Sequence, residues 1–120
     1  MENKVRTRQL KKNSDFLELR RKGQKVRPSE WLQIHFLTSK QETLQVGITA
    51  SRKVGTAVIR NKLKRWSREF FRKKVRAFPL LTGKLNVIFR AQAGEFYKEL
   101  KHEELDAVLD KACRSLRTPS

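Results

Sequence analysis

The feature that most constrains this chain is the segment 51–71, SRKVGTAVIRNKLKRWSREFF, where apolar and cationic residues alternate at helical spacing. At ~100° per residue, one arc of roughly 60° collects the apolar side chains Ile59, Leu63, Trp66, Phe70 and Ala77. A separate arc of about 160° collects Arg60, Asn61, Lys64, Arg65, Arg68, Arg72 and Arg76. This pattern predicts a helix from about Thr56, ended by Pro79 and Gly83, with one buried side and one basic side.

The basic side of this helix needs a partner of opposite charge. Arg60, Lys64 and Arg68 repeat every four residues, so like charges face one another along the helix and weaken it by a few tenths of a kcal/mol per pair. The whole chain has 29 Lys and Arg against 12 Asp and Glu in 120 residues, a net charge of +17. Such a surplus repels itself and favours binding to a polyanion. Nucleic acid, an anionic membrane and an acidic protein all satisfy this requirement.

Three stretches are predicted to be strands. In residues 31–37, WLQIHFL, the side chains of Leu32, Ile34 and Phe36 point to one face and those of the intervening residues to the other. A second alternating stretch spans 44–50, and a short polar link suggests that these two strands form an antiparallel hairpin. The third, KLNVIFRA at 84–91, follows the basic helix, which could therefore join two parallel strands as a crossover.

Two further helices complete the predicted architecture. Residues 14–22, SDFLELRRK, read as a short helix capped by Asn13 or Ser14 and ended by Gly23. A closing amphipathic helix carries Leu105, Val108, Leu109, Ala112 and Leu116 on one side. Residues 1–12 are expected to form a basic, partly mobile arm, and 13–120 a single domain. The order αββαβα predicts an α+β fold, a mixed α/β two-layer sandwich.

The sequence offers little for catalysis by the polypeptide alone. His35 and His102 fall on different predicted elements, and no motif surrounds either of them. Cys113 lies on the inner stripe of the last helix, where a core role is expected, and a single cysteine allows no internal disulfide. No catalytic residue and no protein-bound metal are therefore predicted. Without an apolar run of ~20 residues or a secretory signal, a cytoplasmic location is expected.

Two motifs resemble the bacterial ribonuclease P protein subunit. The stretch VGITASRKVGTAVIRNKLKR, from Val46 to Arg65, matches the family pattern VGxxxSKKxGxAVxRNRxKR, and LKKNSDF at 10–16 matches LKKNxDF. Together with the order of elements, the resemblance covers essentially the whole chain. In two departures, Lys62 stands at the family's second arginine and Arg52 at a common lysine. Charge is kept in both, although Lys62 cannot make a planar two-pronged contact.

The resemblance implies a ribonucleoprotein endoribonuclease in which this chain is the non-catalytic subunit. The partners implied are a large catalytic RNA and precursor tRNA, whose 5′ leader the complex removes with Mg²⁺ bound mainly by the RNA. It also implies a left-handed crossover, against the usual preference, and makes residues 13–120 an RNA-binding domain. No protein partner and no membrane are implied. The residues that match the family's contacts to the catalytic RNA are Arg52, Lys53, Arg60, Asn61, Lys62, Lys64, Arg65 and Arg68.

A second surface is implied for the single-stranded leader, between the first helix and the sheet. Stacking of bases on aromatic rings, with phosphates on nearby cations, is the chemistry such a surface needs. Phe16 matches the family's first-helix aromatic, whereas Arg20 stands where a second aromatic is frequent. His35, on the predicted strand 31–37, aligns with an aromatic on the family's second strand, and Arg90 lies at the end of the third predicted strand. Read without the resemblance, Phe16 is expected to belong to the core rather than to contact a ligand, and Trp31 is expected to be a partly buried anchor.

Two other functions explain the charge. A structural RNA-binding protein, such as a ribosomal component, has the same basic surface but shows no preference for a substrate that carries a leader. A protein of the membrane surface is disfavoured, because the apolar side of the basic helix has the ring spacing of a buried core rather than of an exposed wedge.

Overall fold

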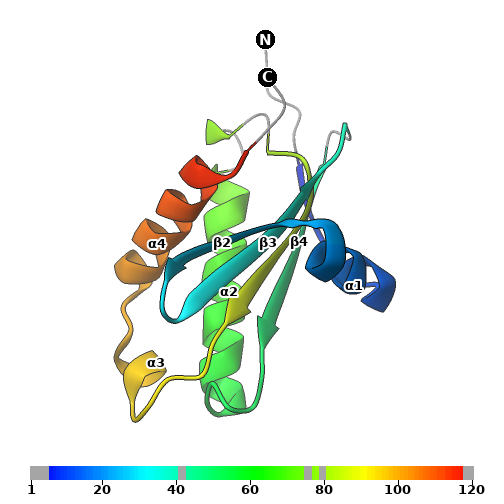
Figure 1. The fold of residues 1–120 in the computed structure, drawn as a ribbon. Coiled ribbons are helices and arrows are strands. Elements are labelled where there is room, and N and C mark those ends of the chain that lie inside the picture. The colour runs from blue at the N-terminus through cyan, green and yellow to red at the C-terminus, as the bar shows by residue number, and fades with distance from the viewer. Residues whose placement is uncertain (1–5, 41–42, 75–76, 79–80, 118–120) are drawn as a thin grey trace.

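The chain folds around one five-stranded mixed sheet (Figure 1). A computed structural model describes residues 6–40, 43–74, 77–78 and 81–117. Its strands are β1 (Arg6–Gln9), β2 (Gln24–Ser29), β3 (Leu32–Thr38), β4 (Thr43–Ala50) and β5 (Gly83–Phe89). Its helices are α1 (Asn13–Lys22), α2 (Ala57–Lys74), α3 (Phe96–Glu99) and α4 (His102–Ser115). The mixed α/β fold predicted from the sequence is confirmed, and β1, β2 and α3 are additional elements.

The strand order is β1-β4-β5-β3-β2. β4 and β5 are parallel, as predicted for strands joined by the basic helix. The predicted hairpin of β3 and β4 is wrong, because β5 lies between them and pairs antiparallel with β3. In the centre of the sheet, β5 is covered on both faces and paired along both edges, which fits its apolar sequence. Pairing β3 directly with β4 would leave β5 less buried. The handedness of the β4-α2-β5 connection stays a prediction.

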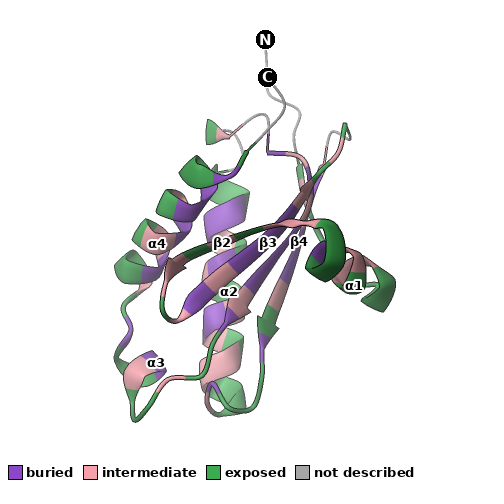
Figure 2. Ribbon diagram, viewed as in Figure 1, coloured by how far each residue is buried: buried purple, intermediate pink, exposed green. Residues whose placement is uncertain are grey.

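The hydrophobic core fills the space between one face of the sheet and the helices α2 and α4 (Figure 2). The inward side chains of β3, Leu32, Ile34 and Phe36, are fully buried, as their alternation predicts. The buried residues of α4 are Leu105, Leu109, Ala112 and Cys113, and the thiol is part of this core. Burial raises the pKa of Cys113 to about 12, which leaves the thiol neutral.

α1 contacts β3 and β5 on the opposite face of the sheet (Figure 1). The predicted side-chain cap by Asn13 or Ser14 is wrong: the N-cap is Lys12, without a side-chain hydrogen bond. Ahead of the helix, the chain is tied to β4 by a hydrogen bond from the N–H of Leu10 to the carbonyl of Val46. Four residues of the predicted arm form β1, while residues 1–5 lie outside the described part of the chain.

Candidate nucleic-acid interface

The outer side of α2 carries the cationic residues that the sequence placed there. Asn61, Arg65, Arg68 and Arg72 are exposed, and Arg60 and Lys64 are partly exposed. Arg52 and Lys53 are exposed in the turn that joins β4 to α2, directly before the helix. We call the set Arg52, Lys53, Arg60, Asn61, Lys64, Arg65, Arg68 and Arg72 the basic face. These residues lie along one side of α2 and in the turn before it.

The buried side of α2 is rotated from the predicted one. Leu63 and Phe70 are buried as expected, but Ser67 and Phe71 are buried too, while Ile59 and Trp66 are only partly covered. The rotation arises because α2 also packs against β1, an element the sequence did not reveal. Two further expectations on α2 have other outcomes: Ala77 is exposed beyond the helix end, and Arg76 and Pro79 lie outside the described residues.

This rotation brings Arg60 to the edge of the buried side. Its Nε atom is buried and has no hydrogen-bond partner among the described residues, although the residue as a whole is partly exposed. The guanidinium is therefore held with part of its bonding capacity unused. An acceptor supplied from outside the protein would satisfy it.

The cations of the basic face lack acidic partners. The ion pairs of the described residues join Lys84 to Asp15 and Glu18, Lys98 to Glu95, His102 to Glu69 and Asp106, and Arg114 to Asp110. Within the part of the chain that the structure describes, no cation of the basic face lies within 4.0 Å of a carboxylate. Glu69, the one acid within the α2 segment, is directed to His102 of α4. The basic face thus keeps its full charge for an external ligand.

Lys62 is not brought together with the basic face. Its Nζ donates to the carbonyl oxygen of Tyr97 at 3.2 Å and lies 4.9 Å from the ring centroid of Trp66. Both contacts hold the ammonium group on the side of α2 that adjoins α3. The structure therefore gives Lys62 a role in joining these two helices.

The four residues predicted for the second surface gather on the α1 side of the sheet. The strand register places Gly47 of β4 beside Asn86 of β5, and Asn86 beside His35 of β3. Phe16 of α1 lies over Gly47 at one end of this row: a Cβ added to Gly47 would be 2.5 Å from Cε1 of the Phe16 ring. Glycine at position 47 is thus what allows the aromatic ring to rest on the sheet.

The surroundings of His35 favour its neutral form. Arg90 donates from Nη1 to Oε1 of Gln33 at 3.3 Å, which turns the amide Nε2 of Gln33 toward Nε2 of His35 at 3.1 Å. Since the amide nitrogen can only donate, Nε2 of His35 must accept and carry no proton. Burial lowers the pKa of His35, and the positive charges of Lys25 and Arg20 lower it further. The chain Arg90, Gln33, His35 therefore connects three of the polar groups on this surface.

Two ion pairs fix α1 over this surface. Nζ of Lys84, on β5, lies 2.8 Å from Oδ1 of Asp15 and 3.1 Å from Oε1 of Glu18. These hydrogen bonds raise the pKa of Lys84 and keep it charged. The contacts tie one turn of α1 to the middle of the sheet and so set the position of Phe16.

Sequence reasoning missed several polar residues of the α1 side. Asn86 is buried, and the hydroxyl of Thr49 donates to its Oδ1 at 3.1 Å. Gln33 links Arg90 to His35, as described above. A signal for Asn86 existed, since it is the one polar residue inside the apolar run LNVIF. Gln33 gave no signal beyond its place in the alternation.

The two surfaces meet at one edge of the sheet. Ala50 pairs with Phe89 at the carboxyl ends of the parallel strands β4 and β5. The residues that follow, Arg52 and Lys53 on one strand and Arg90 on the other, therefore leave the sheet side by side.

The described residues do not offer a site that fits a metal ion. Among them, no group of three or more His, Cys, Asp or Glu side chains is placed to hold one. None of the helices in the described residues is both long enough and apolar enough to cross a membrane.

Comparison with known proteins identifies the family. The Ribonuclease P family profile matches residues 5–115. The ribonuclease P protein component of Geotalea uraniireducens is 32% identical over 102 residues, covering 85% of this chain and 88% of that protein. That of Desulforapulum autotrophicum is 31% identical over 112 residues, covering 92% of each.

Solved structures of RNase P proteins have the same fold as this chain. The RNase P protein from Thermotoga maritima superposes with a TM-score of 0.77 at 29% identity, covering 91% of this chain and 98% of that one. The RNase P protein of Staphylococcus aureus gives a TM-score of 0.73 at 30% identity, covering 88% and 92%. With the profile spanning most of the chain and the fold shared along nearly its full length, the chain belongs to the ribonuclease P protein family.

Proposed function

We propose that this protein is the RNA-binding subunit of a cytoplasmic ribonuclease P, in which a partner RNA carries the catalysis. The observation that carries the proposal is the basic face, a strip of cations along α2 that has no acidic partner among the described residues. Guanidinium groups bind phosphate oxygens in pairs, and Asn61 can both donate and accept. The basic face is the proposed contact with the catalytic RNA, through Arg52, Lys53, Arg60, Asn61, Lys64, Arg65 and Arg68.

The α1 side of the sheet is the proposed surface for the 5′ leader of precursor tRNA. Phe16 offers a ring for base stacking, and Arg20 and Arg90 offer cations for the phosphates. His35 and Gln33 supply hydrogen-bonding groups between them. Such contacts are sequence-tolerant, which suits a subunit that must accept many different precursors.

The protein contributes to leader removal by positioning. Binding the leader and the catalytic RNA at the same time holds the scissile bond against the RNA, and positioning of this kind lowers the barrier without a catalytic side chain. The Mg²⁺ that the reaction requires is proposed to be held by the RNA. The cations of this chain reduce the repulsion between the two RNA molecules.

The experiment compares binding of precursor and mature tRNA to the complex of this protein with its cognate catalytic RNA. A protein that holds the leader gives the precursor an affinity at least about tenfold higher, the equivalent of about one stacked base. Equal affinity for the two tRNAs, with the catalytic RNA still bound, would instead favour a structural RNA-binding protein such as a ribosomal component.

A further inference from the structure

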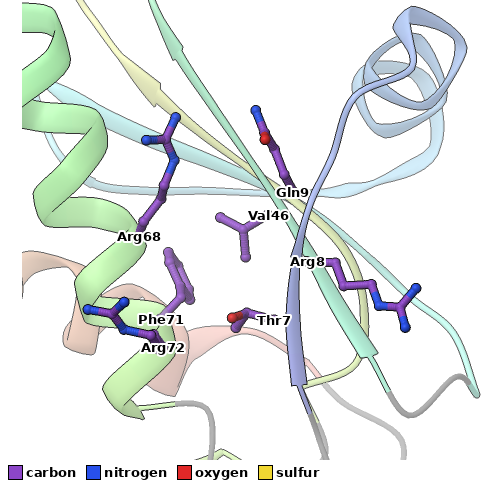
Figure 3. Close-up of a pocket in the computed structure, with 7 residues that line it drawn as sticks. All are labelled: Thr7, Arg8, Gln9, Val46, Arg68, Phe71 and Arg72. Carbon is purple, nitrogen blue, oxygen red and sulfur yellow. The ribbon is translucent and has the colours of Figure 1, made fainter.

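A pocket of about 160 Å³ lies between β1 and the second half of α2 (Figure 3). Its walls come from elements that are far apart in the sequence. From α2 come Arg68, Phe71 and Arg72, and from the sheet come Thr7, Gln9 and Val46. At about 30 Å³ for each water molecule, its volume equals roughly five waters. That is enough for one tetrahedral oxyanion.

The pocket has an apolar floor and polar walls. Figure 3 shows Phe71 and Val46 pointing into the space between helix and strand, with Thr7 directed toward α2. Arg8 also borders the pocket, but its side chain points to the other side of β1, as strand alternation requires. The polar side chains directed to this side of β1 are thus the hydroxyl of Thr7 and the amide of Gln9, both neutral hydrogen-bond donors.

The charge of the pocket has one sign. Every charged residue that borders it is an arginine, and neither Arg68 nor Arg72 is paired with a carboxylate among the described residues. These two arginines stand one helical turn apart, so their like charges repel. A bound anion turns this repulsion into attraction, because each guanidinium can donate two hydrogen bonds to it.

We propose that this pocket binds one backbone phosphate of the partner RNA, with β1 as the second wall of the RNA interface. Arg68 and Arg72 supply the charge, and Thr7 and Gln9 supply neutral donors from the strand. The Arg72 guanidinium extends away from β1 in Figure 3, so it turns toward the pocket when the phosphate binds. The inference rests on the proposed function, which it extends from α2 to the amino-terminal strand. It assigns specific roles to Thr7 and Gln9, which neither charge patterning nor the family motif singled out. It also gives a specific role to Arg72, which charge patterning had placed only on the basic side of the helix.

A bridging phosphate also affects β1 itself. β1 is a four-residue edge strand, held by its pairing with β4 and by contact with α2. A ligand that contacts both α2 and β1 adds a link that the free protein lacks. The amides of residues 6–10 are therefore expected to exchange with solvent more slowly when phosphate is bound.

The first test titrates the full-length protein with inorganic phosphate and follows the amide resonances by NMR. Saturable shifts are expected at residues 7–9 and 68–72, together with slower amide exchange at 6–10. Thr7→Val and Arg72→Gln should each weaken this binding at least threefold. Their matched controls, Thr38→Val on β3 and Arg21→Gln on α1, should not. Shifts confined to other parts of the chain would overturn the proposal.

The second test measures binding to the cognate catalytic RNA at several salt concentrations. Arg72→Gln should reduce the slope of log affinity against log salt by about 0.7–0.9 more than Arg21→Gln does. That difference corresponds to the loss of one phosphate contact. Thr7→Val should weaken binding three- to tenfold with an unchanged slope, because threonine is neutral. If both variants bind like their controls while Arg65→Gln is impaired, the pocket is wrong and the proposed function stands. If the wild-type protein does not bind the RNA, the proposed function fails, and the phosphate titration still decides on the pocket.

Discussion

Phe16 rests its ring edge on Gly47, at the end of the row formed by Asn86 and His35. We predict that Phe16→Ala lowers affinity for precursor tRNA about tenfold, because a stacked base contributes about 1–3 kcal/mol. Affinity for the catalytic RNA should stay nearly unchanged, since Phe16 is far from α2 in the fold. Separate titrations of the protein with precursor tRNA and with the catalytic RNA measure the two affinities. Phe16→Leu is the matched variant, which keeps apolar contact with Gly47 but loses the stacking ring. Equal losses for both RNAs would assign Phe16 to the core.

His35 makes the stability of the protein depend on pH. Its folded-state pKa lies below the ordinary histidine value of about 6.5, so the unfolded chain takes up this proton first as the pH falls. Stability is therefore lost as the pH drops through 6.5 toward the lowered folded value, by at most about 1.4 kcal/mol per pH unit. Urea unfolding between pH 7.5 and 5 measures this. His35→Gln should have a shallower dependence, and an identical dependence would show that His35 is not the responsible group.

Single residues show where sequence reasoning reached its limit. The alternation of β3 correctly assigned Leu32, Ile34 and Phe36 to one face and His35 to the other. Lys62 was grouped with the basic residues by the family pattern, but its contact with the Tyr97 carbonyl depends on the position of α3. A contact between residues 35 positions apart cannot be read from local spacing. The same is true of the chain from Arg90 through Gln33 to His35.

At the scale of elements, α2 is expected to bind RNA mainly through charge. Arg65→Gln should reduce the slope of log affinity against log salt by about 0.7–0.9, because one fewer phosphate counterion is displaced. Filter binding to the catalytic RNA between 50 and 400 mM salt, roughly, gives this slope. Arg21→Gln on the outer side of α1 removes the same charge and serves as control. If both variants have the same slope, α2 has no special role in the interface.

α1 is positioned by Lys84 through its contacts with Asp15 and Glu18. Lys84→Met should destabilise the protein by about 1 kcal/mol and weaken leader binding, because the helix that carries Phe16 loses its attachment to β5. Affinity for the catalytic RNA should not change. Lys98→Met breaks an exposed pair with Glu95 in α3 and is expected to have neither effect. A leader affinity that survives Lys84→Met would mean that other contacts position α1.

Helices were predicted from the sequence more completely than the sheet. The 3.6-residue period identified α1, α2 and α4, because each buries one side along its length. β1 and β2 were missed because they are edge strands with polar sequences, RTRQ and QKVRPS, and show no apolar alternation. The pairing of β3 with β5 was missed because it joins residues about fifty positions apart, and strand spacing carries no information on such contacts.

For the molecule as a whole, the sheet separates the two proposed binding surfaces. The basic face lies on α2 on one side, and the proposed leader surface lies under α1 on the other (Figure 1). They meet where β4 and β5 end together, with Arg52 and Lys53 close to Arg90 in the register. One small domain can therefore contact a large RNA and a substrate strand at the same time. The residues proposed for the basic face and for the leader surface were predicted from the sequence. How the two surfaces lie relative to each other follows from the position of β5 between β4 and β3, which was not predicted.

The protein is proposed to assist an RNA catalyst by positioning and charge. The most direct measurement is the cleavage rate of precursor tRNA by the cognate catalytic RNA at low Mg²⁺, with and without the protein. At least about tenfold stimulation is predicted. It should be lost in the combined variant Arg60→Gln, Arg65→Gln, Arg68→Gln, and the protein alone should cleave nothing. An unstimulated RNA, or cleavage by the purified protein without RNA, would contradict the account.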